Sequence, residues 1–143
     1  RGLGDVYKRQ TQALGQTEAN TKVSNESEPA KMIPAVTKES ISIDLKAGQA
    51  TEVKLAMPKG ASVNFDWKTS GGGLNFDTHG DPVNAPKDFY HGYGKGRNET
   101  QQSGTLTAAF DGKHGWFWRN RNKESVTVTL TVEGQFSEIK RIF

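Results

Sequence analysis

From Thr37 onward, hydrophobic and polar residues alternate with a period of two. Ile41, Ile43 and Leu45 are separated by polar residues, and the pattern recurs in later segments separated by short turns. Alternation of this kind places one face of a strand in a core and the other face in solvent. The later alternating segments run over 53–57, 63–67, 74–78, 106–110, 116–118, 126–132 and 136–142. These segments predict an all-β domain over residues 37–143, an antiparallel β-sandwich with jelly-roll topology.

Residues 79–102 interrupt this pattern. The segment contains prolines, several glycines, aromatic residues and two of the histidines, and it shows no alternation. A loop of this length inside a compact domain is usually functional or packed as an excursion. We therefore expect one long loop between two groups of strands.

The N-terminal part of the chain is predicted to be unpacked. Residues 1–10 resemble translated sequencing-adapter sequence, which recurs at the ends of metagenomic reading frames, so we expect them to form no part of the fold. Residues 11–36 are rich in Gln, Thr, Asn, Ser and Glu and contain few large apolar side chains. A segment of this composition does not bury enough surface to offset its ordering entropy, which predicts a flexible stalk.

Composition excludes several function classes. Cysteine is absent, which removes thiol nucleophiles, disulfides and Cys-ligated metals. The net charge of +3 comes from basic residues spread along the chain, and the denser run 119–123 is interpreted as a turn between strands, so no nucleic-acid partner is expected. Neither a nucleophile elbow nor a phosphate-binding loop is found, and the scattered Asp residues suit turns, so we predict no enzymatic activity.

Each of the three histidines, His79, His91 and His114, precedes a glycine. We predict that the three lie near one another at the end of the sandwich next to the long loop. Grouped neutral imidazoles could bind Cu or Zn, with Asp77 as a further ligand. The favoured alternative is structural, with the imidazoles fixing the loop through hydrogen bonds. No other cofactor is indicated.

Aromatic residues cluster in the segment before the basic run. On a strand, Trp116 and Trp118 share one face, where they could fill a core poor in leucine or stack on a sugar or a peptide. Trp67 and Trp116 are predicted to be core residues, whereas both interpretations stay open for Trp118. The candidate ligand-binding residues are Tyr90, Tyr93, Trp118, Arg119 and Asn120.

Several longer motifs carry a resemblance to a known family. They are GQATEVK at 48–54, NFDTHG at 75–80, AAFDG at 108–112, HGWFWRN at 114–120 and VTVTL at 126–130. With them the chain resembles the periplasmic part of bacterial "transmembrane anchor" proteins. The resemblance implies a transmembrane helix upstream of Thr11, anchoring to the inner membrane and a setting beside metal-resistance and efflux functions. Residues 110–136 are also similar, over less of the chain, to the GOLD β-sandwich, an interaction module of eukaryotic cargo receptors.

Together these observations predict a non-enzymatic periplasmic binding module, anchored to the inner membrane in the full-length protein. Its expected partner is a protein of an envelope complex. The alternative is a periplasmic Cu- or Zn-binding accessory of a metal efflux or resistance system. The identity of the ligand and the oligomeric state stay open at this point.

Overall fold

The structure, a computed structural model, describes residues 34–143, and every regular element in this range is a β-strand. None of the described residues forms an apolar helix of the length needed to cross a membrane. The strands are β1 Val36–Leu45, β2 Ala50–Met57, β3 Ser62–Ser70, β4 Leu74–Pro82, β5 His91–Glu99, β6 Gln101–Thr107, β7 Gly112–Arg119, β8 Val126–Gln135 and β9 Glu138–Arg141. The predictions made for residues 1–33 lie outside the described range.

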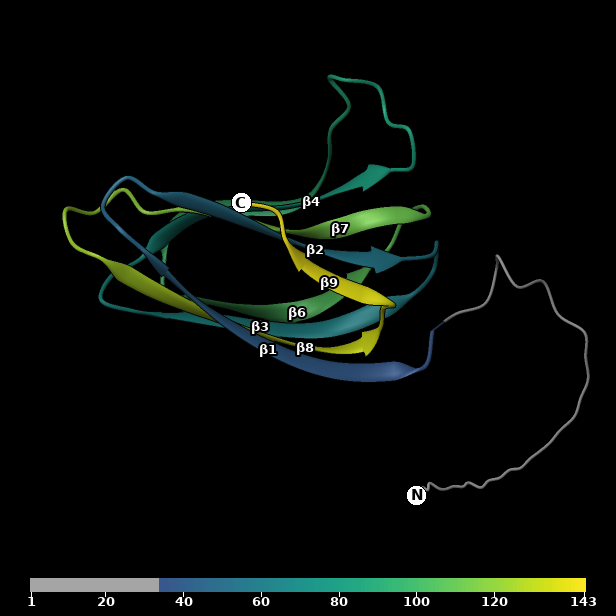
Figure 1. The fold of residues 1–143 in the computed structure, drawn as a ribbon, viewed down its shortest axis with the longest axis horizontal. Helices are drawn as coiled ribbons and strands as arrows, with labels where there is room; N and C mark the ends of the chain where they lie inside the picture. The colour runs from purple at the N-terminus through teal and green to yellow at the C-terminus, as the bar shows by residue number, and fades with distance from the viewer. Residues whose placement is uncertain (1–33) are drawn as a thin grey trace, which may run out of the picture. The chain divides into compact units, whose positions relative to one another are not determined.

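The strands form two antiparallel sheets that pack face to face (Figure 1). The smaller sheet has the order β1-β8-β3-β6, and the larger sheet has the order β5-β4-β7-β2-β9. Successive strands cross from one sheet to the other, except at the β4–β5 connection. This interleaved order is that of a jelly roll with β9 added at one edge. The prediction of an all-β antiparallel sandwich is confirmed.

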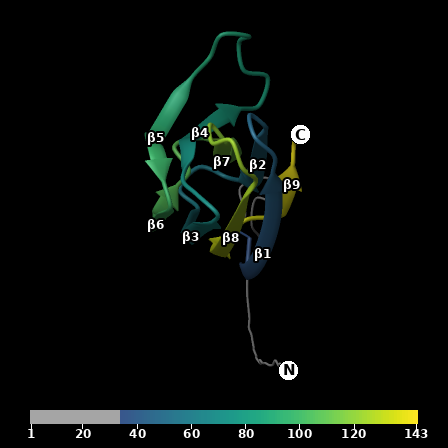
Figure 2. The ribbon, with the colours of Figure 1, turned by 90° about the vertical axis from the view of Figure 1, so that its left-hand side faces the viewer.

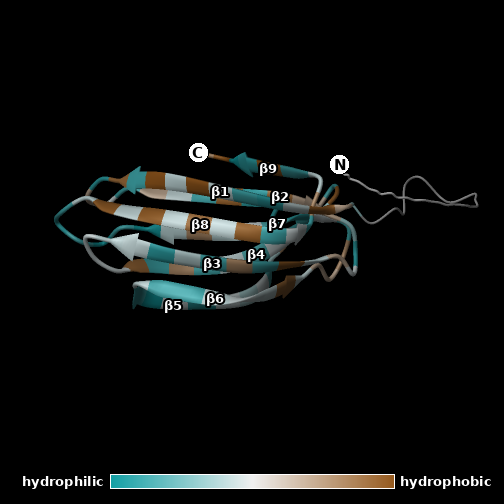
Figure 3. Ribbon diagram, turned by 90° about the horizontal axis from the view of Figure 1, so that it is seen from below, coloured by the Kyte–Doolittle hydropathy of each residue, from teal (hydrophilic) through white to brown (hydrophobic). Residues whose placement is uncertain are grey.

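The core lies between the sheets and is built from the inward positions of the alternating segments. Figure 3 shows this alternation as bands of hydrophobic and hydrophilic residues along the strands. Strand β8 is the clearest case, because Val126, Val128, Leu130 and Val132 are buried while the intervening threonines face outward. β8 pairs with β1 on one side and β3 on the other, which explains why its pattern is so regular.

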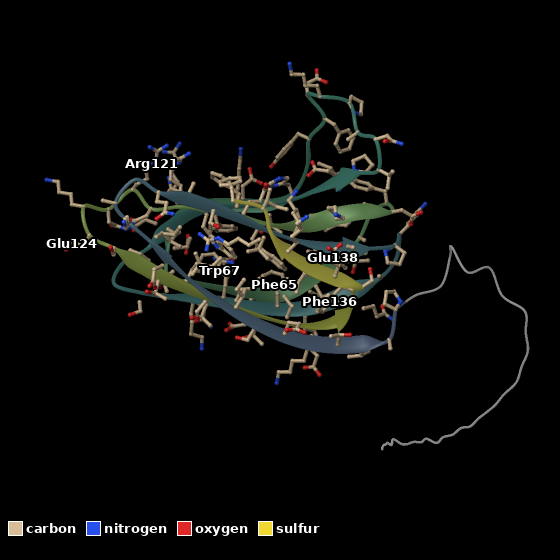
Figure 4. All side chains as sticks on the ribbon, in the orientation of Figure 1. Phe65, Trp67, Arg121, Glu124, Phe136 and Glu138 are labelled. Carbon is tan, nitrogen blue, oxygen red and sulfur yellow. The ribbon has the colours of Figure 1, made fainter. Side chains whose placement is uncertain are left out.

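All three tryptophans are fully buried in this core. Trp67 and Trp118 pack edge to face with ring centroids 5.8 Å apart. Trp116 stacks on Trp118 at 6.4 Å, and Phe65 packs against Trp116 at 5.3 Å. Figure 4 shows Phe65 and Trp67 between the two sheets. The prediction that Trp67 and Trp116 are core residues is confirmed, and Trp118 joins them.

The structure differs from the sequence prediction in residues 79–102. Most of this segment is strand: it contains the end of β4, all of β5 and the start of β6, so that the loop itself covers only residues 83–90. Among the described strands, β5 is an edge strand that pairs with β4 alone, through two register shifts. Its glycines and exposed polar residues produce no hydrophobic alternation, which is why the pattern failed to indicate a strand.

Candidate interaction surface

Three His-Gly dipeptides lie side by side on β5, β4 and β7. On the outer face of the larger sheet, His79 pairs with Gly92 on one side and Gly115 on the other. On the inner face, Gly80 pairs with His91 and His114. Because paired residues of adjacent strands share a face, His79 points outward, whereas His91 and His114 point toward the sandwich interior. Each imidazole therefore lies beside positions that have no side chain.

The space above Gly115 is used by charged side chains that reach across β7. Gly115 also pairs with Lys54 on β2, so β7 places no side chain between β2 and β4 at this level. Oε2 of Glu52 lies 3.0 Å from Nε2 of His79, and the Lys54 ammonium donates a hydrogen bond to the Asp81 carboxylate. We refer to Glu52, Lys54, Asp77, His79 and Asp81 as the charge cluster.

Only glycine fits at position 115. A Cβ atom there would lie 1.9 Å from the backbone oxygen of Val53, far inside van der Waals contact. Any other residue would therefore force β2 and β7 apart. The same glycine permits the close strand pairing and opens the space that the charge cluster fills.

Within the charge cluster, the contact between Glu52 and His79 shifts the pKa values of these two groups. The Lys54 side chain is only 4% exposed, and it is compensated by Asp81 and by Glu52 at 3.7 Å. The hydrogen bond from His79 holds the pKa of Glu52 below its ordinary value, and Lys54 acts in the same direction. The hydrogen bond to Glu52 raises the pKa of His79, against the opposing effect of burial. The pair is thus stabilised in its doubly charged form.

Tyr90 joins the loop of residues 83–90 to the charge cluster. Its hydroxyl donates to the Asp77 carboxylate, at 3.0 Å from Oδ1 and 3.2 Å from Oδ2. Its ring stacks on the His79 imidazole with centroids 6.0 Å apart and planes 29° apart. Partial burial and the Asp77 carboxylate raise the pKa of Tyr90, so the phenol keeps the proton that it donates. More than half of the Tyr90 side chain nevertheless remains exposed.

The loop of residues 83–90, which we call the projecting loop, stands away from the sandwich (Figures 1 and 2). Its conformation is fixed locally. Asn84 adopts the left-handed region at φ 59°, and the backbone N–H of Phe89 donates to the carbonyl of Pro86 at 3.1 Å. Val83 is 70% exposed, Tyr90 56% and Phe89 36%. The loop thus presents apolar side chains to solvent.

Inside the sandwich, His114 belongs to an aromatic group. Its Nε2 lies 2.9 Å from the carbonyl of Phe110, and its Nδ1 lies 2.9 Å from the hydroxyl of Tyr93. His91 packs against both Tyr93 and Phe110, with centroids 5.0 Å and 5.4 Å away. Burial lowers the pKa of His114, which keeps its imidazole neutral. A Cβ at Gly80 would lie 2.3 Å from Nδ1 of His114, so Gly80 leaves room for this ring.

This geometry corrects the predicted three-histidine metal site. The backbones of His79, His91 and His114 are brought together, but the sheet separates the His79 side chain from the other two. Asp77 lies on the outer face, beside His79 alone. Among residues 34–143 no group of three or more His, Asp or Glu side chains is arranged to hold a metal ion. The predicted ligand set therefore does not fit one Cu or Zn ion.

The five candidate ligand-binding residues do not form one site, because the structure places them in different environments. Trp118 and Asn120 are fully buried, which excludes direct contact with a ligand at the surface. The Asn120 amide instead donates to three backbone carbonyls of neighbouring turns. The Tyr93 hydroxyl is hydrogen-bonded to Nδ1 of His114, and the Arg119 guanidinium donates to the Gly48 carbonyl. Of the five, Tyr90 alone stands in an exposed, apolar setting.

Sequence reasoning missed Glu52, Lys54, Asp81, Val83 and Phe89. A signal was present for the first two, because they alternate with the core residues of β2 and must therefore lie on its outer face. That β2 and β4 lie on either side of β7 depends on the sheet order, which no local pattern reveals. Val83 and Phe89 lie in a segment without hydrophobic alternation, so the sequence pattern did not indicate that their side chains are exposed.

Comparison with known proteins gives no family assignment: no family model matches the chain, and no curated protein matches it. Among solved structures, the chain is similar to the Aeromonas hydrophila protein PliG, a periplasmic lysozyme inhibitor of g-type lysozyme. The identity is 19%, the TM-score is 0.46, and the match covers 68% of this chain and 86% of that one. The Yersinia pseudotuberculosis-derived mitogen is 8% identical at a TM-score of 0.46, with coverage of 74% and 89%. These similarities concern β-rich folds and carry no argument about function.

Proposed function

We propose that this chain is a non-enzymatic interaction module that binds a protein of an envelope complex through the projecting loop. The observation that carries the proposal is the exposure of Val83, Phe89 and Tyr90 on the projecting loop. Apolar side chains that are held in place and exposed are characteristic of protein recognition surfaces.

The surroundings of the loop support a protein partner. Lys87 and Asp88 lie in the loop beside the apolar side chains, and the charge cluster lies next to its C-terminal end. A polar surround with an aromatic centre is the usual composition of a protein interface. Tyrosine is well suited to the central position, because it is large, has few rotatable bonds and carries a hydroxyl.

The charge cluster supports a role without catalysis. Nε2 of His79 is engaged by Glu52, and its Nδ1 is enclosed with no hydrogen-bond partner among the described residues. A general base needs a nitrogen that can reach a substrate proton. His114 is enclosed by Tyr93 and Phe110 in the same way. Both histidines are better suited to holding the fold than to moving protons.

The cellular setting of the proposal comes from the sequence resemblance. We place the sandwich in the periplasm, tethered to the inner membrane by a helix upstream of Thr11 in the full-length protein. The projecting loop would then be accessible to proteins of the envelope. The copper or zinc alternative has no supporting observation in residues 34–143.

Site-specific photo-crosslinking in the bacterial periplasm tests this function. A photoreactive amino acid is placed at Val83 or Phe89, and, as a control, at Ser42 or Thr129 on the outer face of the smaller sheet. We expect a discrete crosslinked envelope protein from the loop positions and none from the control positions. Val83→Asp should abolish the crosslink formed from position 89 without lowering the melting temperature, because Val83 is exposed. Equal crosslinking from both faces would overturn the proposal.

A further inference from the structure

A cleft lies between the two sheets on the side formed by the edge strands β5 and β6, which are visible together in Figure 2. Its volume is about 320 Å³, which is at the lower end of the range of small-molecule sites. It contains no residue of the projecting loop or of the charge cluster. We propose that this cleft binds a small, neutral aromatic molecule that carries one hydrogen-bonding group.

The walls of the cleft are aromatic and held from behind. Phe65, Phe76 and Leu106 line it from β3, β4 and β6. Phe65 packs against Trp116 and Phe76 packs against Trp67, each with ring centroids 5.3 Å apart. Because the tryptophans are fully buried, the two phenylalanine rings are fixed by the core behind them. A preformed aromatic surface of this kind favours a flat apolar ring.

Two glycines keep the cleft open. Of the atoms in the described part of the chain, a Cβ at Gly94 would meet none within 4 Å, and one at Gly104 would meet only the Phe65 ring, at 3.5 Å. Neither glycine has a positive φ, so the backbone does not demand glycine at these positions. Methyl groups would fit at both positions and would take up part of the space. Their absence on both facing edge strands leaves room for a ligand.

Two polar groups in the cleft are available to a ligand. Within the described residues, neither the Thr78 hydroxyl nor the Gln102 amide makes a side-chain hydrogen bond. The other hydroxyls are engaged: Tyr93 accepts from the Ala109 N–H at 3.1 Å, and Thr105 donates to Asn64 at 2.8 Å. A sugar would leave several hydroxyls without partners in this cleft, whereas a ring with a single polar group would leave none.

The charge distribution favours a neutral ligand. Among residues 34–143, Lys95 is the sole charged residue that lines the cleft. Its pairing with Asp77 places it on the outer face of the larger sheet, on the opposite side from Phe76 and Thr78. A carboxylate or an ammonium group inside the cleft would therefore lose its hydration without gaining an ionic partner. A phenol or a similar neutral group avoids this cost.

NMR titration of the full chain tests the inference, with the backbone amides of Gly94 and Gly104 as reporters. The probes are 4-methylphenol, toluene, 4-methylbenzoate and glucose. We expect saturable shifts at both glycines with 4-methylphenol, at an affinity about fivefold higher than that of toluene. The charged analogue and glucose should produce no saturable shifts at these reporters.

Variants on the two faces of β6 locate the site. Gly104→Leu fills the cleft and should lower the affinity for 4-methylphenol by about tenfold or more. Ser103→Leu adds the same bulk to the exposed outer face of the same strand and should leave the affinity unchanged. Gln102→Leu should remove the preference for 4-methylphenol over toluene. If Gly104→Leu does not fold, Gly94→Leu blocks the cleft from the other wall.

Three results would overturn the inference. The first is the absence of saturable shifts at Gly94 and Gly104 with 4-methylphenol at concentrations up to about 10 mM. The second is unchanged affinity in a folded variant with a filled cleft. The third is tighter binding of 4-methylbenzoate or glucose than of 4-methylphenol.

Discussion

Trp118 lies where the packing of the core can be tested most directly. Its side chain is fully buried, edge to face with Trp67 and stacked on Trp116. Truncation of a buried tryptophan to alanine costs about 3–5 kcal/mol, because transfer free energy is lost and a cavity is left. Domains of this size are stable by only about 5–15 kcal/mol, so Trp118→Ala removes a large share of that total.

The comparison with Trp118→Phe tests the contribution of the buried indole N–H to stability. The indole Nε1–H of Trp118 is buried and has no acceptor among the described residues. Leaving such a donor unpaired costs about 1–3 kcal/mol. Replacement by phenylalanine removes this donor but also loses buried carbon worth about 2 kcal/mol. The two effects oppose each other, and we expect Trp118→Phe to change the free energy of unfolding by about 1 kcal/mol or less.

Urea denaturation followed by far-ultraviolet circular dichroism measures both variants. With a denaturant slope of about 2 kcal/mol/M, Trp118→Ala should lower the urea midpoint by about 2 M, and Trp118→Phe by about 0.5 M or less. A Trp118→Ala midpoint close to that of the wild type would refute the core assignment. A Trp118→Phe midpoint as low as that of Trp118→Ala would refute the argument from the unpaired donor.

Three further predictions concern the histidines and the buried turn amide. The Glu52–His79 pair should stabilise the fold most between pH 4.5 and 6.5, the ordinary pKa values of the two groups. This stabilisation is lost as pH rises through the raised pKa of His79 and as pH falls through the lowered pKa of Glu52. The difference in unfolding free energy between wild type and Glu52→Gln should therefore shrink at high and at low pH. A difference that stays constant with pH would contradict the pairing. Asn120→Ala should lower the free energy of unfolding by about 3 kcal/mol in urea titration, because buried carbonyls lose their donor; an unchanged midpoint would show that water replaces the amide. Gly80→Ala should cost about 2 kcal/mol and shift the His114 ring resonances in NMR spectra, because the new methyl group overlaps the imidazole; unchanged resonances would contradict the contact.

The fold could be predicted from the sequence because most strands have one face in the core. β2, β3, β4, β7 and β8 each bury alternate residues, and alternation is visible without any knowledge of the partner strands. β5 could not be found in this way. It is an edge strand with glycines at inward positions, so its contribution to the core is too small to leave a hydrophobic pattern.

The candidate interaction surface was harder to predict, because it depends on which strands are neighbours. Tyr90 was identified by its setting in an aromatic segment, but its partners Asp77 and His79 come from another strand. Glu52 and His79 are separated by β7 in the sheet and meet only because Gly115 lies between them. Trp118 and Asn120 were chosen for their chemistry, and a single sequence does not show whether such residues are buried.

The strand pattern nevertheless contained the information needed to reject the shared metal site. In β4, Leu74 and Thr78 are inward positions, so His79 must point outward. In β7, Trp116 is an inward position, and His114 therefore points inward as well. The alternation of inward and outward positions along each strand thus assigns the two imidazoles to opposite faces of whichever sheet holds both strands.

The pKa values of His79 and His114 are shifted in opposite directions because the two side chains lie on opposite faces of the sheet. Two His-Gly dipeptides that pair antiparallel place each imidazole beside the glycine of the other strand, once on each face of the sheet. The outward imidazole of His79 meets carboxylates and is favoured in its charged form, whereas the inward imidazole of His114 is enclosed by aromatic rings and is favoured as neutral. The same dipeptide therefore has two different roles. On the outer face, His79 forms the ionic pair with Glu52 and stacks on Tyr90 of the projecting loop. On the inner face, the neutral imidazole of His114 is hydrogen-bonded to Tyr93 at the aromatic end of the core.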